Sequence, residues 1–388
     1  MILLDKPFVS DFLKRTIVDE QLPVIKTEGL EQFGLSGEAD IWEQEAALRK
    51  LRQEGPGPLY SNSENALGWM MNQLGFSDLP QKITLFKDKV VFRELLRPVY
   101  PDFYFSKHTL QELFTLNVDH LPMPLIVKPA VGFFSMGVHK VTHQDEWEDA
   151  LRSIQAEMKA VQALYPDAVL DTSRFIIEAV VEGEEFAIDA YYDDAGNVVL
   201  LNILHHLFSS SEDVSDRVYI TSREIIAAYQ EKFTDFLATI GNLAKLRRFP
   251  VHAEVRIDAQ GRIIPIEINP MRFAGWCTTD VAYYAYGINP YTCFFRQTAP
   301  DWPDILAQND EHLYSIVVLD MPGDVEANDI KRFDYQSVCA QFESPLELRK
   351  INFGDYPVFG FIFTKTRKEN IAELEAILRS DLKEFIDF

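Results

Sequence analysis

Two glutamates and an asparagine in one stretch of the chain could hold a divalent cation. Residues 251–275 read VHAEVRIDAQGRIIPIEINPMRFAG, in which two β-like runs flank the turn signal DAQG. Glu267 and Asn269 point to one face of the second run, because side chains two residues apart in a strand share a face. If the runs pair antiparallel across this turn, Glu254 lies opposite Glu267. We therefore expect three oxygen ligands to converge on one face of a sheet.

Carboxylate and amide oxygens are hard ligands, and they suit Mg²⁺ that is shared with a phosphorylated substrate. Two carboxylates this close repel each other unless a cation lies between them. The alternative is a solvated acidic face on an edge hairpin, since polar residues on one face of a strand are common. This stretch by itself leaves both interpretations open.

A lysine followed by a glycine-containing loop could bind a polyphosphate. The apolar run PLIV ends at Lys128, and PAVGFFSMGV follows, with Gly132 and Gly137 on either side of Phe134 and Ser135. Such a loop can turn backbone N–H groups toward phosphate oxygens, and its glycines allow close approach. No G-K-[ST] ends the loop, so it is not a Walker A sequence. The alternative is a glycine-bearing β-hairpin with an exposed lysine.

A third segment could contact the base and the ribose of a nucleotide. Residues 174–192 read RFIIEAVVEGEEFAIDAYY, in which one strand ends at Glu178 and a second follows Glu185. Adenine needs an apolar slot with backbone hydrogen bonds, and a ribose needs an acceptor for its hydroxyl groups. Val181, after Val180, and Glu185 can supply these. An acidic connection between two buried strands is the alternative interpretation.

The composition is that of a folded, acidic protein with two or three domains. The chain has 388 residues, of which 47% are hydrophobic, and a formal net charge of -23. This charge argues against non-specific binding to nucleic acid or to an anionic membrane. We find no secretory signal and no run of about 18 apolar residues. Three sparse cysteines fit reduced thiols, so we expect a cytoplasmic protein that binds neither nucleic acid nor membranes.

Periodicity and capping residues predict the elements that would position these segments. Near the N-terminus, strand–helix–strand order predicts a small α/β unit with parallel strands, and Ser10 is a candidate helix cap. One helix is expected over Gln81–Arg97, and another over about 222–244. The chain after about residue 300 contains two strands and an amphipathic helix. We interpret it as a small α+β cap or dimerisation segment.

Together, these segments resemble the ATP-grasp superfamily. The shared pattern is a lysine before a glycine loop, then EAVVEGEEF, then E…E-x-N, and it covers roughly residues 81–291. Within the superfamily the chain resembles the carboxylate–amine ligases, a group that includes biotin carboxylase and D-alanine–D-alanine ligase. The resemblance implies an α/β (α+β) protein with mostly antiparallel sheets in the ATP-grasp part. Its implied parts are a pre-ATP-grasp-like domain over 1–95, a two-lobed ATP-grasp domain over 96–300 (lid lobe about 107–185, metal-site lobe about 186–300) and the C-terminal segment 301–388.

The resemblance implies which residues bind ATP. They comprise two lysines, a loop that folds over the triphosphate, an adenine hinge and a ribose acceptor: Lys89, Lys128, Gly132, Phe134, Ser135, Gly137, Glu178, Val180, Val181 and Glu185. In this pattern Lys128 reaches the α- and β-phosphates, and the backbone of Val180 and Val181 forms the hinge beside Glu178.

The resemblance also implies a metal set and an arginine that binds substrate. The set for two Mg²⁺ ions, for which Mn²⁺ can substitute, is Glu254, Glu267 and Asn269. Arg272 resembles the arginine that holds the substrate carboxylate or the transferred phosphate, although an extra residue, Met271, precedes it. Arg256 is a second candidate, because it shares a strand face with Glu254. The substrate pocket is expected among Arg217, Tyr219, Trp276 and the two arginines, which indicates an anionic carboxylate end.

The implied reaction is ATP-dependent ligation. ATP converts a poorly electrophilic carboxylate into an acyl phosphate, an amine or another nucleophile attacks it, and ADP and phosphate are released. Two alternatives remain: a kinase that stops at phosphoryl transfer, and a nucleotide-binding regulatory protein without turnover. The expected partners are ATP, a small carboxylate, an amine acceptor and, for a homodimer, a second copy of the chain.

Overall fold

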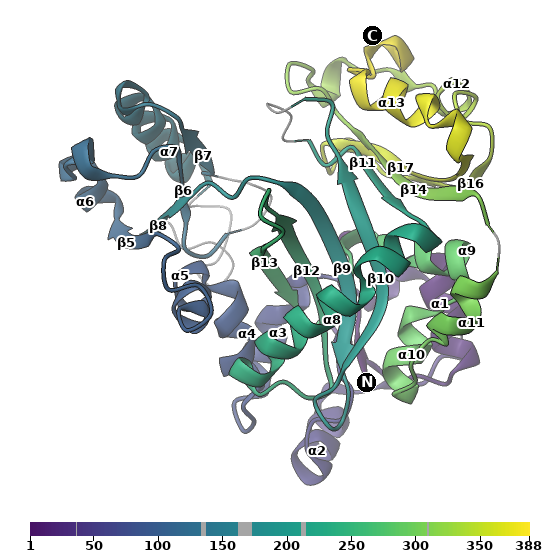
Figure 1. The fold of residues 1–388 in the computed structure, drawn as a ribbon. Coiled ribbons are helices and arrows are strands. Elements are labelled where there is room, and N and C mark those ends of the chain that lie inside the picture. The colour runs from purple at the N-terminus through teal and green to yellow at the C-terminus, as the bar shows by residue number, and fades with distance from the viewer. Residues whose placement is uncertain (36, 133–136, 162–172, 211–214, 309) are drawn as a thin grey trace.

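The computed structural model describes residues 1–35, 37–132, 137–161, 173–210, 215–308 and 310–388. Its elements form a small N-terminal sheet, a lobe that stands off to one side and a large central sheet (Figure 1). The predicted mixture of helices and mostly antiparallel strands is confirmed. Among the described residues, none of the helices combines the length and apolar content that crossing a bilayer requires.

The N-terminal region is a parallel sheet with helices around it. Its strands are ordered β3–β2–β1–β4 and every pair is parallel, as predicted. The Ser10 side chain caps the first helix by accepting a hydrogen bond from the N–H of Leu13. The elements are β1 (Ile2–Leu3), α1 (Asp11–Asp19), β2 (Val24–Ile25), β3 (Ile41–Trp42), α2 (Gln44–Glu54), β4 (Tyr60–Ser61) and α3 (Leu67–Gln73).

Two short helices replace the single helix predicted over Gln81–Arg97. Helix α4 (Leu79–Lys87) ends, and helix α5 (Lys89–Leu96) begins, at Asp88, whose side chain accepts hydrogen bonds from two backbone N–H groups of α5. The prediction was wrong because an aspartate stabilises a helix N-terminus better than a helix interior. The break leaves Lys89 as the first residue of α5.

A smaller lobe comprises residues 105–132, 137–161 and 173–179, around a four-stranded antiparallel sheet of order β5–β8–β6–β7, and we call it the lid lobe because most of it falls within the range predicted for that lobe, about 107–185. Trp147, Leu151 and Ile154 on its long helix pack against apolar strand residues that include Val127 and Phe175. Its elements are β5 (Phe105–Thr109), α6 (Leu110–Thr115), β6 (Leu125–Pro129), β7 (His139–Val141), α7 (Trp147–Val161) and β8 (Arg174–Ala179).

An eight-stranded antiparallel sheet forms the body of the protein, in the order β13–β12–β9–β10–β11–β14–β17–β16. Helix α8 packs against β10, with its N-terminus capped by Ser222 and with Ile226, Phe233 and Leu237 buried. The strands in the first part of the sheet are β9 (Glu184–Tyr192), β10 (Val198–Leu207), β11 (Val218–Thr221), β12 (Phe249–Ile257) and β13 (Ile263–Pro270), and helix α8 spans Arg223–Ala244.

The sheet continues past residue 300. Strand β14 pairs with β11, and β17 and β16 follow it, so the C-terminal residues extend the sheet that carries the predicted metal ligands. These strands are β14 (His312–Asp320), β16 (Pro345–Lys350) and β17 (Val358–Arg367). The remaining α-helices and β-strands are α9 (Val281–Tyr286), α10 (Pro290–Arg296), α11 (Trp302–Ala307), β15 (Arg332–Phe333), α12 (Tyr335–Cys339), α13 (Ala372–Arg379) and β18 (Ile386–Asp387).

Candidate active site

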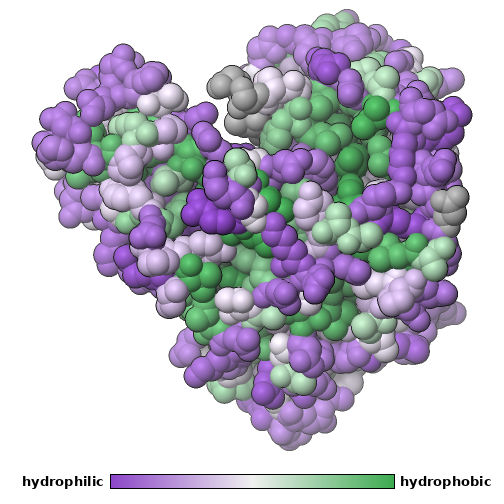
Figure 2. Space-filling view, viewed as in Figure 1, coloured by the Kyte–Doolittle hydropathy of each residue, from purple (hydrophilic) through white to green (hydrophobic). Residues whose placement is uncertain are grey.

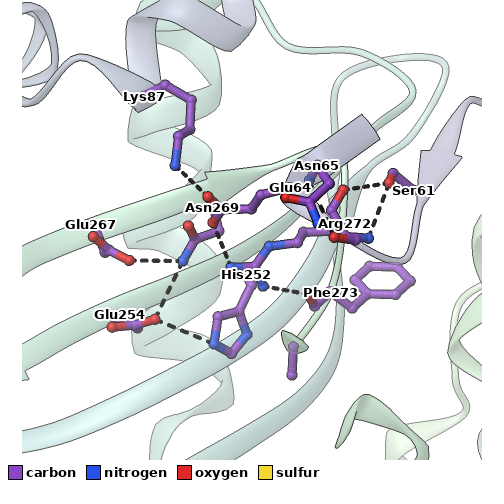
Figure 3. Close-up of polar contacts among 12 residues, drawn as sticks. Ser61, Glu64, Asn65, Lys87, His252, Glu254, Glu267, Asn269, Arg272 and Phe273 are labelled. Atoms are coloured by element: carbon purple, nitrogen blue, oxygen red, sulfur yellow. Dashed lines mark hydrogen bonds and ion pairs between the residues drawn. The ribbon is translucent and has the colours of Figure 1, made fainter. Parts of the chain in front are cut away.

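Strands β12 and β13 bring the three predicted metal ligands together. The strands pair antiparallel with Glu254 opposite Glu267, which is the register predicted from the sequence. The Asn269 Nδ2 atom lies 3.0 Å from Glu267 Oε1 and 3.3 Å from Glu254 Oε1 (Figure 3). The three side chains therefore meet on one face of the sheet.

This face is the floor of a cavity of about 550 Å³ between the lid lobe, the N-terminal region and the central sheet. In the space-filling view the lid lobe stands off from the body across a notch (Figure 2). The predicted site residues that line the cavity are Lys89, Lys128, Gly132, Glu178, Val180, Val181, Glu185, Tyr219, Glu254, Arg256, Glu267, Asn269, Arg272 and Trp276.

Glu178 pairs with two cationic side chains in one wall of the cavity. Its carboxylate accepts a hydrogen bond from Arg93 Nε at 2.8 Å and pairs with the Lys128 ammonium. Burial would raise the pKa of Glu178, but Arg93 and Lys128 together lower it to about 2. The side chain is therefore ionised and engaged in this network, and Val180 and Val181 line the cavity beside it.

Lys89 connects the metal-site floor to the start of the glycine loop. Its Nζ atom lies 3.3 Å from the carbonyl oxygen of Gly132 and 4.0 Å from Glu267 Oε2. Burial lowers the pKa of Lys89 to about 8, and the nearby Glu267 carboxylate opposes this shift. The cation thus lies within reach of both the floor and the loop.

Of the other predicted glycine-loop residues, only Gly137 is among the described residues. Phe134 and Ser135 lie outside the described residues. Gly137 is not among the described lining residues. It has a φ of 68°, and its N–H donates to Glu157 Oε2 at 2.9 Å. A side chain there would press on Met158, so packing within the lid lobe accounts for this glycine.

Glu185 and Arg256 form a pair on the side of the cavity next to Val181. Arg256 Nε donates to Glu185 Oε2 at 2.8 Å, and its NH1 group donates to the Val181 carbonyl at 2.6 Å. His206 Nδ1 lies 3.0 Å from Glu185 Oε1, and the His206 ring stacks on Tyr219 with centroids 4.1 Å apart. Burial would raise the pKa of Glu185, but His206 and Arg256 keep it below its usual value. Arg256 therefore faces the predicted ribose side rather than Glu254.

The extra residue before Arg272 is accommodated by a left-handed backbone turn. Met271 is 1% exposed and has a φ of 65°, and its carbonyl accepts a hydrogen bond from the N–H of Ser61 at 2.8 Å. Arg272 lines the cavity, where it donates to Glu64 Oε1 at 2.8 Å and to the carbonyl of Phe273 at 2.9 Å (Figure 3).

Glu64 and Lys87 belong to this site although sequence reasoning missed them. Lys87 Nζ donates to Glu64 Oε2 at 2.6 Å, so Glu64 lies between Lys87 and Arg272. Burial would raise the pKa of Glu64, but Lys87 and Arg272 hold it well below its usual range. Glu64 and Arg272 are 208 residues apart, and no local pattern connects them. Lys87 has a local signal, because it stands two positions before Lys89.

Arg349 supports the turn that carries Trp276. Trp276 and Cys277 have φ values of 56° and 55°, which are unusual for residues with side chains. Arg349 on β16 donates to the carbonyls of Trp276 and Cys277 at 3.1 and 2.8 Å, and to Asp280 Oδ2 at 2.7 Å. A residue of the C-terminal segment thus fixes part of the cavity wall.

Arg217 does not belong to the predicted substrate pocket. Its Nε atom lies 2.5 Å from Asp320 Oδ1, and its NH1 group donates to the carbonyls of Ser380 and Ile377 at 2.6 and 3.2 Å. Asp320 and two carbonyls at the C-terminal end of helix α13 hold the guanidinium, and Arg217 is not among the described residues that line the cavity.

The donor set on the hairpin fits a divalent cation. Burial and the facing Glu267 carboxylate raise the pKa of Glu254 well above its usual value. Rotation of the Asn269 amide would place its oxygen in the same space. Among the described residues no group of three or more His, Cys, Asp or Glu forms a metal cluster, so this mixed carboxylate–amide set is the candidate. Hard oxygen donors favour Mg²⁺.

A known protein family and several solved structures resemble this chain in sequence or in fold. Residues 121–280 match the family model described as ATP-grasp domain. No curated protein matches the sequence. An L-amino acid ligase from Bacillus licheniformis has a TM-score of 0.67 and 18% identity over 100% of this chain and 97% of that chain.

Two of the other similar solved structures are complexes with nucleotides. One is the biotin carboxylase–β,γ-ATP complex from Campylobacter jejuni (TM-score 0.63, 11% identity, 100% of this chain and 91% of that chain). The other is the biotin carboxylase domain dimer of the Hydrogenobacter thermophilus 2-oxoglutarate carboxylase with MgADP, ADP and bicarbonate (TM-score 0.61, 12% identity, 100% and 90%). Residues 121–280 therefore match an ATP-grasp domain, and over its whole length the chain has the fold of these proteins.

Proposed function

We propose that the protein is an ATP-dependent ligase that activates a small-molecule carboxylate as an acyl phosphate. An amine or another nucleophile then attacks, and ADP and phosphate are released. The observation that carries this proposal is that Glu254, Glu267 and Asn269 share one cavity with Arg272 and with the lysines of the predicted phosphate site. The ATP-grasp domain over residues 121–280 supports it.

The nucleotide would lie between the lid lobe and the central sheet. The backbone of Val180 and Val181 would meet the adenine, and Glu185 would accept hydrogen bonds from the ribose. Lys89 and Lys128 would neutralise phosphate oxygens. Lys128 is paired with Glu178, and Lys89 lies 4.0 Å from Glu267. Each lysine would therefore share its charge between a protein carboxylate and the phosphates.

Glu254, Glu267 and Asn269 would hold Mg²⁺, as two ions, at the floor. The chemistry supplied at this floor by bound Mg²⁺ would be neutralisation of the charge that develops during phosphoryl transfer. Glu267 also faces Lys89, so its carboxylate would orient a cation and a metal at the same time. The protein's own task at this floor is to hold the oxygens of the nucleotide in one fixed arrangement.

Arg272 is the candidate for binding the substrate carboxylate. A guanidinium presents a planar fork of donors that matches a carboxylate, and Arg272 already holds one, that of Glu64. A substrate carboxylate oxygen would attack the γ-phosphorus, and the bond to ADP would break. The amine would then attack the activated carbonyl carbon, and phosphate would leave. Closure of the lid lobe would exclude water, which would otherwise hydrolyse the acyl phosphate.

A panel of amino acids and small acids, each with and without added amines, tests this proposal. With ATP and Mg²⁺ we expect ADP, free phosphate and an amide from the productive pair. Phosphate retained on the substrate would indicate a kinase. If no substrate pair led to formation of ADP although the protein still bound added ADP, the protein would be a nucleotide-binding protein without turnover.

The Glu267→Gln variant tests the metal assignment. It removes one charge from the floor, and we expect the rate of ADP release to fall about 100-fold or more, the scale on which loss of one charge-stabilising group acts. The exposed Glu231→Gln on α8 is the matched control and should keep the wild-type rate. Full activity of the Glu267 variant would show that the metal assignment is wrong.

A further inference from the structure

A buried histidine–aspartate pair links the metal-site hairpin to the neighbouring strand β9. His252 and Glu254 are two residues apart on β12 and share its cavity-side face. The His252 Nδ1 atom lies 2.8 Å from Asp189 Oδ1, and its Nε2 atom lies 3.6 Å from Glu254 Oε1. Figure 3 shows the His252 ring beside the Glu254 carboxylate. One ring therefore connects a buried carboxylate with a candidate metal ligand.

The pair is built into the sheet. Asp189 on β9 lies opposite His252 in the register of β9 and β12, and the two residues are 0% and 7% exposed. Asp189 Oδ1 also accepts a hydrogen bond from the N–H of Ala274 at 2.8 Å, whereas Oδ2 has no hydrogen-bond partner among the described residues. A buried carboxylate with an unsatisfied oxygen is costly, so its contacts are candidates for a role beyond packing.

We propose that Asp189 and His252 are positioning residues for Glu254. Asp189 holds the imidazole in one orientation, and the imidazole restricts the Glu254 carboxylate to the position in which it meets Glu267 and Asn269. A free glutamate side chain loses rotamer entropy when it binds a metal, and a glutamate that is already restricted loses less. This inference rests on the proposed function, because the metal in question is the one that accompanies the nucleotide.

The same carboxylate also connects the metal floor with the arginine turn. Ala274, which donates to Asp189, stands two residues after Arg272. Asp189 therefore ties the position of Glu254, through His252, to the backbone that carries Arg272. The metal ligand and the candidate substrate-binding arginine are held by one buried group.

Two substitutions of His252 separate its two contacts. In His252→Asn the amide nitrogen takes the place of Nδ1 and can still donate to Asp189, but the side chain does not reach Glu254. In His252→Gln the amide nitrogen takes the place of Nε2 and still reaches Glu254, without the anchor on Asp189. His312→Asn is the matched control, because His312, at the start of β14 and outside the cavity lining, has its Nδ1 atom 2.6 Å from Asp310 Oδ1.

The measurement is Mn²⁺ binding to the full chain in saturating ADP, by calorimetry or by the EPR signal of free Mn²⁺. We expect His252→Asn to weaken Mn²⁺ binding about 10-fold, the scale found when outer partners of metal ligands are removed, with the number of sites unchanged. His252→Gln should weaken it less, and His312→Asn should bind Mn²⁺ as the wild type does.

Equal Mn²⁺ affinities of the wild type and His252→Asn would overturn the inference alone. A reduced number of sites with unchanged affinity in both His252 variants would also overturn it, because it would show loss of folded protein rather than loss of positioning. A wild-type protein that binds no Mn²⁺ in the presence of ADP would overturn the proposed function, and the inference with it.

Discussion

The described cations that line the cavity each face a carboxylate of the same cavity. Lys87 and Arg272 face Glu64, and the other pairs are Arg93 and Lys128 with Glu178, Arg256 with Glu185, and Lys89 with Glu267. An anionic substrate must therefore share or displace an internal carboxylate when it binds. This exchange bears most directly on the proposed reaction at Arg272, because Arg272 is the candidate for binding the substrate carboxylate. Its present partner, Glu64, comes from the N-terminal region.

We expect Arg272→Lys to lower kcat/KM for the carboxylate substrate about 10-fold or more, because an ammonium keeps the charge but lacks the planar fork of donors. ADP affinity, measured by calorimetry, should stay within about twofold, since the lysines and the hinge bind the nucleotide. Arg262→Lys, at an exposed arginine of the same hairpin, is the control and should change neither quantity. A loss of ADP affinity equal to the loss in kcat/KM would place Arg272 on the nucleotide instead.

Among the elements, the ion network of Glu178 ties the lid lobe to the helix that enters it. Glu178 stands on β8, Lys128 on β6 and Arg93 on α5, and all three side chains are buried. Arg93 also donates to the carbonyl of Pro265 on β13, so the network reaches the central sheet. Removing the one carboxylate would leave two buried cations without a counter-charge, which is strongly destabilising.

The pKa of Glu178, about 2 in the folded protein against an ordinary 4.5, gives this network a pH dependence. The stabilisation is complete above pH 4.5 and is lost as the pH falls from about 4.5 through about 2. At pH 7 we expect Glu178→Gln to lower the free energy of unfolding by about 3 kcal/mol.

Urea unfolding of wild type and variant at pH 7 and pH 3 measures this effect, and the difference should shrink at the lower pH. The control is Glu148→Gln at an exposed site on α7, for which we expect less than about 0.5 kcal/mol. A Glu178 effect that does not depend on pH would mean that its ion pairs are not the source.

Local patterns predicted the elements that carry the site but not the contacts between distant segments. The register of Glu254 with Glu267 follows from strand alternation and a short turn, and the cap at Ser222 marks the start of α8. Asp88 broke a predicted helix because its capping preference outweighed the apolar period around it. The pairing of Glu64 with Arg272 depends on how two regions pack, and no spacing within either region encodes it.

At the scale of the whole molecule, one sheet runs from the metal ligands on β12 and β13 to the C-terminal strands β14, β17 and β16. The chain after residue 300 therefore does two things: it covers the edge of β11, and through Arg349 it holds the turn of Trp276 and Cys277. The C-terminal cap expected from the sequence is joined to the site by backbone pairing, which composition and periodicity do not reveal.

We expect a chain that ends at residue 300 to aggregate and to lose ADP binding. Strand β11 would become an edge with unpaired backbone groups, which are a template for association between chains, and the turn of Trp276 would lose Arg349. Light scattering and ADP calorimetry on the shortened chain measure both effects. A monomeric shortened chain that binds ADP as the full chain does would show that the extended sheet is dispensable.

The pairing of cavity cations with carboxylates has a consequence for how fast a nucleotide arrives. The protein has a formal net charge of -23. The described residues that line the cavity offset this charge little, because their cationic and acidic side chains are equal in number. The cationic ones are Lys87, Lys89, Arg93, Lys128, Arg256 and Arg272, and the acidic ones are Glu64, Glu178, Glu185, Asp216, Glu254 and Glu267. A bare nucleotide is therefore repelled at long range. Added salt screens this repulsion and speeds the encounter, and a nucleotide that carries its own divalent cation approaches against a smaller barrier.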